Sequence, residues 1–172
     1  HLLPILQRTT RLKNDTMQMV SLFRIEQKKT FPMDDAWPRD TVTDAIEATS
    51  LQFPNLTFDN QISEECQGFY NENLLLLALV TLITNSAQAG ATDIVFSADE
   101  RDGLTLRIED NGHGFDPAIL KGEKDTTRSE GSGLGLYFVQ LIAEHHQRGD
   151  TRGSIRITNR AQGGACVDIH LP

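Results

Sequence analysis

The chain has 172 residues, of which 38% are hydrophobic and 23% are charged, as is typical of one globular domain with a short additional segment. Its formal net charge of −8 argues against nucleic acid or an anionic membrane surface as a partner. The longest apolar run, at residues 74–80, is too short to cross a bilayer. Cys66 and Cys166 lie far apart in the sequence, so we expect reduced thiols in a cytoplasmic protein.

Residues 1–29 are predicted to form one helix with an apolar stripe. Because a single helix cannot bury such a stripe, we expect a partner helix from outside this chain; the alternative is that the stripe packs on the rest of the chain. The chain starts at His1 rather than Met, so we expect it to be a piece of a longer protein. Residues 30–39 have the composition of a linker. The stripe follows a heptad pattern at Leu2, Ile5, Thr9, Leu12, Thr16, Met19 and Phe23.

The remaining residues, 40–172, alternate between helical and strand-like patterns. Asn71 or Asn73 can cap the second predicted helix, and Gly90 can end it. This order of elements predicts an α+β sandwich in which helices cover one face of a mixed sheet. Helices are predicted over residues 40–50 and 74–89 and from the segment 131–136 onward, and strands over residues 56–58, 93–98, 104–109, 154–159 and 165–171.

An acidic turn follows one of these strands. The alternating segment 104–109 leads directly into Asp110, which is followed by Gly112 and Gly114. Glycine admits positive φ and lets a ligand approach the backbone closely, so the segment suggests a small ligand held against the main chain. The alternative is a plain tight turn capped by Asp110 and Asn111.

Two further features suggest a ligand. Asn85 is an amide near the end of a helix that is apolar nearly all round, so it must either be satisfied by nearby backbone or bind something. The glycine-rich segment 131–136 opens a helix, whose free N–H groups and dipole favour an anion. It lacks the spacing and the preceding strand of a dinucleotide fingerprint, and no Gly-x-x-x-x-Gly-Lys-Ser/Thr phosphate loop occurs in the chain.

In their order along the chain, these features resemble the GHKL (Bergerat) ATP-binding fold, a two-layer sandwich shared by sensor histidine kinases, type II topoisomerases, mismatch-repair ATPases and a heat-shock chaperone. The resemblance covers residues 55–172 and includes the closing Gly163-Gly164 hairpin. Residues 19–26 also resemble the second helix of a sensor-kinase dimerisation hairpin, and residues 168–172 resemble a kinase C-terminal strand. The implied division is a partial hairpin at 1–29, a linker at 30–39 and a catalytic ATP-binding domain at 40–172.

The resemblance implies ATP and Mg²⁺ as ligands. Asn85 would hold Mg²⁺ through its carbonyl oxygen, and Asp110 would accept a hydrogen bond from the exocyclic amine of adenine, which Gly112 and Gly114 would let approach. Residues 116–130 would form a lid, where Thr126-Thr127-Arg128 resembles the Thr-Thr-Lys signature of nitrogen-regulatory-type kinases, with Thr127 and Arg128 acting on the transferring phosphoryl group. The implied nucleotide-binding set is completed by Thr126, Gly131, Ser132, Gly133, Leu134, Gly135, Leu136 and Gly164.

The implied function is transfer of the ATP γ-phosphoryl group to a histidine and then to an aspartate of a response-regulator receiver domain, in a homodimer joined by a four-helix bundle. No histidine here matches the phosphoacceptor, so we expect it to lie outside this chain, which alone should not autophosphorylate. His145 and His146 are predicted to be solvated helix residues, and His113 and His170 surface residues of a turn and a strand. A longer parent protein could carry a membrane anchor.

Two residues depart from the family pattern. Thr81 lies one helical turn before Asn85, where the hydrolytic branches place a glutamate as general base, which argues against a chaperone-like or topoisomerase-like ATPase. Ala165 stands where a threonine often helps to hold adenine. Two alternatives stay open: a GHKL protein Ser/Thr kinase of the anti-sigma type, against which the heptad helix argues, and a degenerate nucleotide-binding scaffold, which Thr81 and Ala165 suggest.

Overall fold

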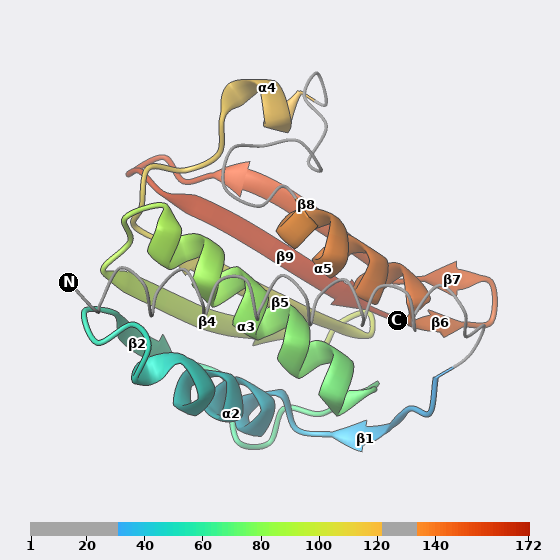
Figure 1. Ribbon diagram of the computed structural model, residues 1–172. Helices are drawn as coiled ribbons and strands as arrows, with labels where there is room; N and C mark the ends of the chain where they lie inside the picture. The colour runs from blue at the N-terminus through green and yellow to red at the C-terminus, as the bar shows by residue number, and fades with distance from the viewer. Residues whose placement is uncertain (1–30, 122–133) are drawn as a thin grey trace.

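The computed structural model describes residues 31–121 and 134–172 (Figure 1). The predicted helix at residues 1–29 lies outside the described residues, as do residues 122–130 of the predicted lid and residues 131–133 of the glycine-rich segment. The elements are β1 (Asp34–Ala36), α2 (Pro38–Ser50), β2 (Thr57–Asn60), β3 (Gly68–Tyr70), α3 (Glu72–Gln88), β4 (Asp93–Asp99), β5 (Leu104–Asp110), α4 (Pro117–Leu120), α5 (Leu134–His145), β6 (Gln147–Arg148), β7 (Thr151–Arg152), β8 (Ser154–Asn159) and β9 (Ala165–Leu171).

Five of the strands form one mixed sheet in the order β2-β4-β5-β9-β8. β2 runs parallel to β4, and the other neighbouring pairs in this sheet are antiparallel. The two predicted hairpins, β4–β5 and β8–β9, are confirmed. Side chains of a strand alternate between the two faces of a sheet, and the inward set of β9 is buried as predicted: Ala165, Val167, Ile169 and Leu171.

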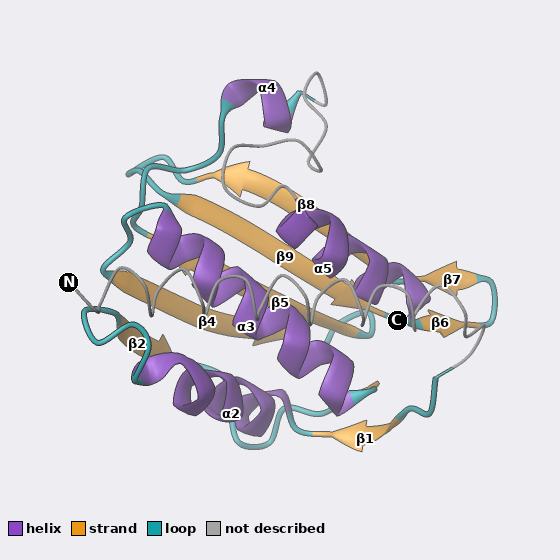
Figure 2. Ribbon diagram, in the orientation of Figure 1, coloured by secondary structure: helices purple, strands orange, loops and turns teal. Residues whose placement is uncertain are grey.

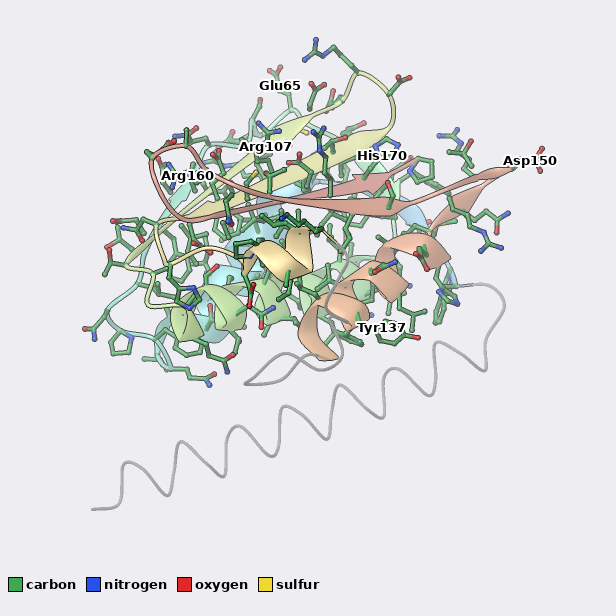
Figure 3. All side chains as sticks on the ribbon, turned by 90° about the horizontal axis from the view of Figure 1, so that it is seen from above. Glu65, Arg107, Tyr137, Asp150, Arg160 and His170 are labelled. Atoms are coloured by element: carbon green, nitrogen blue, oxygen red, sulfur yellow. The ribbon has the colours of Figure 1, made fainter. Side chains whose placement is uncertain are left out.

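Helices α2, α3 and α5 lie on the same face of this sheet (Figures 1 and 2), which confirms the predicted two-layer α+β sandwich. Leu79 of α3, Phe138 of α5 and Ile169 of β9 are fully buried in the core between the layers. The opposite face of the sheet carries polar side chains, including Arg107 and His170 (Figure 3). None of the described helices is both long enough and apolar enough to cross a membrane.

Asn71 is the residue that caps α3. Its side-chain oxygen accepts a hydrogen bond from Leu74 N at 3.0 Å, which satisfies one of the N–H groups that a helix leaves without a partner at its start. The helix ends at Gln88, one residue before the predicted end, and Gly90 follows with φ +79°. The first of the two capping positions considered from the sequence is therefore confirmed.

The prediction that residues 30–39 form a linker is wrong in part. β1 pairs with β3 in an antiparallel register, and Ala36 is fully buried. Helix α2 begins at Pro38, two residues before its predicted start, because proline at the first helical position loses no intrahelical hydrogen bond. The sequence also missed β3, α4 and the β6–β7 hairpin, since elements of two to four residues are too short for a periodic pattern to show.

The prediction that His146 is solvated is also wrong. His146 is 3% exposed, and its Nε2 accepts a hydrogen bond from Asn71 N at 3.1 Å. Nδ1 therefore carries the proton and donates to Ile142 O at 2.8 Å. Burial lowers the pKa of this imidazole, since removal from water disfavours the charged form. His113, by contrast, is exposed in its turn, as predicted.

Candidate functional site

The carboxylate of Asp110, the last residue of β5, is buried among hydrogen-bond donors. The residue is 5% exposed. Ser86 Oγ of α3 donates to Oδ2 at 2.7 Å, whereas the backbone N–H groups of Gly112 and Ala165 donate to Oδ1 at 2.9 and 3.1 Å. Each carboxylate oxygen can accept about two hydrogen bonds, so Oδ2 keeps an acceptor position that the described residues do not use. The carboxylate is thus fixed in place and can accept one more donor.

The turn after Asp110 is fastened to the end of α3. His113 N donates to Ala89 O at 3.0 Å, and a Cβ atom on Gly112 would lie only 2.7 Å from the same oxygen. Glycine at 112 is therefore required by the approach of α3. Asp110 does cap its own turn through Gly112, which is the alternative that the sequence left open, but its side chain also contacts Ser86 of α3 and Ala165 of β9.

The β8–β9 hairpin holds the other side of this turn. The side-chain amide of Asn159 accepts from Phe115 N at 2.7 Å and donates to Phe115 O at 3.0 Å. Arg160 Nη1 donates to Asp110 O at 2.8 Å. Gly164 has φ +105°, and a Cβ atom there would collide with the carbonyl of Asp110. Gly164, which the sequence assigned to the nucleotide-binding set, therefore packs against the main chain of Asp110.

Asn85 lies beside the start of α5 and directly precedes Ser86 on α3. A Cβ atom on Gly135 would lie 3.0 Å from both the oxygen and the nitrogen of the Asn85 amide, so the first turn of α5 approaches this amide closely. Asn85 is half-buried, and its side chain forms no hydrogen bond within residues 31–121 and 134–172. The amide can therefore serve a ligand, and the alternative of an amide satisfied by neighbouring backbone finds no support in the described part of the chain.

Other residues of the predicted set lie elsewhere or outside the described residues. Thr126, Thr127, Arg128, Gly131, Ser132 and Gly133 lie outside them, and Leu134 is the first residue of α5. Leu136 is half-buried and lines a cavity of about 240 Å³ between α5 and β8, not the surroundings of the Asp110 carboxylate. The other residues lining that cavity are Gln140, Glu144, Ser154, Ile155 and Ile157.

Thr81 and Ala165, the two residues that depart from the family pattern, are both buried. Thr81 is 4% exposed, and its hydroxyl donates to Leu77 O at 2.8 Å. At this position, one turn before Asn85, α3 therefore carries a hydroxyl group and not a carboxylate. Ala165 contacts Asp110 through its backbone N–H. The Thr81 hydroxyl, which is hydrogen-bonded to its own helix, is not basic enough to activate water. The described residues thus provide no general base for hydrolysis at this position.

Sequence reasoning missed Ser86, Asn159 and Arg160. Ser86 could have been found, because it shares a helix with Asn85 and is a small polar residue in an otherwise apolar segment. Nothing in the local sequence pairs Asn159 or Arg160 with a turn that lies more than 40 residues earlier in the chain. Within the described residues, no group of three or more His, Cys, Asp and Glu side chains is arranged to hold a metal ion.

The chain is similar in sequence to known proteins. Residues 70–172 match the family described as histidine kinase-, DNA gyrase B-, and HSP90-like ATPase. The chain is 31% identical to the tetrathionate sensor histidine kinase TtrS of Salmonella typhimurium strain LT2, over 81% of this chain and 25% of the relative. It is 26% identical to the putative sensor histidine kinase NtrY-like of Rickettsia prowazekii strain Madrid E, over 96% and 28%.

A solved structure is similar as well. The ATP binding domain of PrrB from Mycobacterium tuberculosis superposes with a TM-score of 0.64 at 26% identity and covers 83% of this chain and 98% of that one. The chain spans only about a quarter of the length of the two curated relatives. The family match, by contrast, covers more than half of the chain and includes Asn85, Asp110 and Gly135. This protein belongs to the histidine kinase-, DNA gyrase B-, and HSP90-like ATPase family.

Proposed function

We propose that this chain is the ATP-binding catalytic part of a sensor histidine kinase of the nitrogen-regulatory type. The observation that carries the proposal is the Asp110 carboxylate, which three donors hold in place and which keeps one acceptor position. That position suits the exocyclic amine of adenine, because a buried acceptor with a fixed direction selects a base that offers a donor there. The named sensor kinases among the relatives and the absence of a carboxylate at Thr81 favour a kinase over a hydrolytic ATPase.

Mg²⁺ would be held by Asn85 together with the nucleotide phosphates. An amide carbonyl is a suitable hard oxygen ligand, and Mg²⁺ is commonly bound by one or two protein ligands plus substrate phosphates. The free amide of Asn85 fits this role, since no described residue occupies it with a hydrogen bond. When bound, the ion would neutralise charge on the phosphates. The start of α5 at Gly135 would offer N–H groups to the same phosphates.

Phosphoryl transfer would need residues beyond those described. We infer that Thr127 and Arg128 lie near the γ-phosphoryl group and that Arg128 offsets its developing negative charge. The acceptor would be a histidine of the parent protein, from which the group would pass to an aspartate of a response-regulator receiver domain. The parent protein would form a homodimer through a four-helix bundle to which residues 1–29 contribute one helix.

A calorimetric titration with a non-hydrolysable ATP analogue, with Mg²⁺ and with a chelator, tests this proposal. We expect binding that Mg²⁺ strengthens. Asn85→Ala should remove most of the magnesium-dependent gain and keep the weaker magnesium-independent binding. Asn73→Ala is the matched control, because Asn73 is an exposed amide in the first turn of the same helix. Absence of binding at millimolar nucleotide would instead favour the degenerate scaffold.

A further inference from the structure

Arg160 connects the β8–β9 hairpin to the end of β5. It is the first residue after β8 and begins the loop that joins β8 and β9 (Figure 3). Its Nη1 donates to Asp110 O at 2.8 Å, and its Nε lies 3.5 Å from Glu109 Oε2. Its own backbone closes the hairpin turn, since Arg160 N donates to Gly164 O at 2.8 Å. One side chain thus contacts two consecutive residues at the point where β5 enters the acidic turn.

The contact with Asp110 lies just beyond the last paired residues of two strands. The register between β5 and β9 ends with Glu109 opposite Cys166, so Asp110 is the first residue past that pairing. There the guanidinium donates to the Asp110 carbonyl, while the main chain of Gly164 approaches the same carbonyl too closely to allow a side chain. The hairpin therefore holds the Asp110 carbonyl from one side, while Asp110 is also paired with Ile94 of β4.

Arg160 is partly buried together with its ion-pair partner. Only 20% of its side chain is exposed, and Glu109, its ion-pair partner, is 29% exposed. The Nε atom is buried and has no hydrogen-bond partner within the described residues. Buried polar groups usually find partners, because an unpaired donor loses its bonds to water without replacement. Arg160 is thus a partly buried arginine whose Nε lies near the Glu109 carboxylate without a hydrogen bond to any described residue.

The same hairpin also holds the side chain of Asp110. Ala165, at the start of β9, donates its backbone N–H to Oδ1 at 3.1 Å. Arg160 and Ala165 together fix the carbonyl and the carboxylate of one residue. A shift of the Asp110 peptide would also move the free acceptor position of Oδ2, because the side chain is attached to that backbone.

We propose that Arg160 is a positioning residue for nucleotide recognition. It keeps the Asp110 main chain in place, so that Oδ2 faces the exocyclic amine of adenine with the correct direction. This inference rests on the proposed function, in which Asp110 binds adenine. Arg160 itself does not contact the nucleotide in this scheme. The alternative is a purely structural role, in which Arg160 stabilises the hairpin and has no effect on which base is bound.

The affinities for ADP and IDP separate these two roles, since IDP carries a carbonyl oxygen in place of the exocyclic amine. We expect Arg160→Met to weaken ADP binding about 5- to 20-fold, by misaligning one hydrogen bond to a charged acceptor, and to change IDP binding much less. The preference for ADP over IDP should shrink accordingly. Arg107→Met is the matched control, because it also removes an arginine paired with a carboxylate, Asp168, on the same sheet, and it should leave both affinities unchanged.

Arg160→Lys should retain an intermediate preference for ADP, since lysine keeps a charged donor but not the planar fork. Melting temperatures of all variants are measured in parallel. A lower melting temperature of Arg160→Met with an unaltered ratio of ADP to IDP affinity would overturn the proposal. If Arg160→Met does not fold, an unaltered ratio of ADP to IDP affinity in Arg160→Lys would overturn the proposal instead. Failure of the proposed function would be visible in the unmodified chain, which would then bind neither nucleotide or bind both equally.

Discussion

The substitution Asp110→Asn tests the central element of the site, because the structure indicates which atom changes its chemistry. Oδ1 accepts two backbone N–H groups, from Gly112 and Ala165. An asparagine can keep its oxygen at that position and place its NH₂ group where Oδ2 was. Ser86 can then rotate its hydroxyl and accept from the new NH₂ group. The fold should therefore survive the change.

What the variant loses is the free acceptor position. A donor now faces the exocyclic amine of adenine, so a buried hydrogen bond is replaced by two donors in contact. An unpaired buried donor costs about 1–3 kcal/mol, which corresponds to about 5- to 150-fold weaker binding of an ATP analogue. The free energy of unfolding should fall by only about 1–2 kcal/mol, because the remaining hydrogen bonds change from charged to neutral but are still formed.

Isothermal titration calorimetry and urea unfolding measure these two quantities. Asp99→Asn is the control for the loss of one negative charge, since Asp99 lies at the far end of β4 and pairs with the exposed Arg101. We expect its nucleotide affinity to equal that of the unmodified chain. An Asp110→Asn variant that folds and binds the analogue with unchanged affinity would refute the assignment of adenine to Asp110.

Three further predictions concern the fold around the site. Gly164→Ala should reduce the free energy of unfolding by at least about 2 kcal/mol more than Gly163→Ala in urea titrations, because both positions have positive φ but only the Cβ at 164 meets a neighbouring backbone; equal losses would contradict the close approach. Burial lowers the pKa of His146 in the folded state. The free energy of unfolding should therefore be independent of this group above its ordinary pKa of 6.5. It should decrease as the pH falls below 6.5, because the unfolded chain takes up the proton more readily than the folded chain. His146→Gln should flatten this pH dependence of the melting temperature, whereas the control His170→Gln should not. Burial raises the pKa of Cys66 to about 12, so this thiol should react with a disulfide reagent at neutral pH only after unfolding; rapid reaction in the folded state would contradict its burial.

Much of the fold follows from patterns within short segments. The alternation at residues 104–109 and 165–171 predicted β5 and β9, and the continuous apolar segment beginning at Leu74 predicted the buried helix α3. These signals are local, because the periods of strands and helices are read from neighbouring residues. The acidic turn and Asn85 were also recognisable from the sequence, since glycines and a polar residue in an apolar helix are conspicuous without any partner.

The tertiary structure decided which distant segments meet. Composition suggested a linker at residues 30–39, yet β1 is held there by pairing with β3. The position of His146 near a helix end predicts a solvated side chain, yet the N-cap residue of α3, Asn71, donates a hydrogen bond to its buried ring. Two of the three donors to the Asp110 carboxylate come from positions 24 and 55 residues away, and Arg160 reaches the Asp110 carbonyl across 50 residues. No short segment specifies such contacts, because they depend on how the helical layer and the sheet pack together.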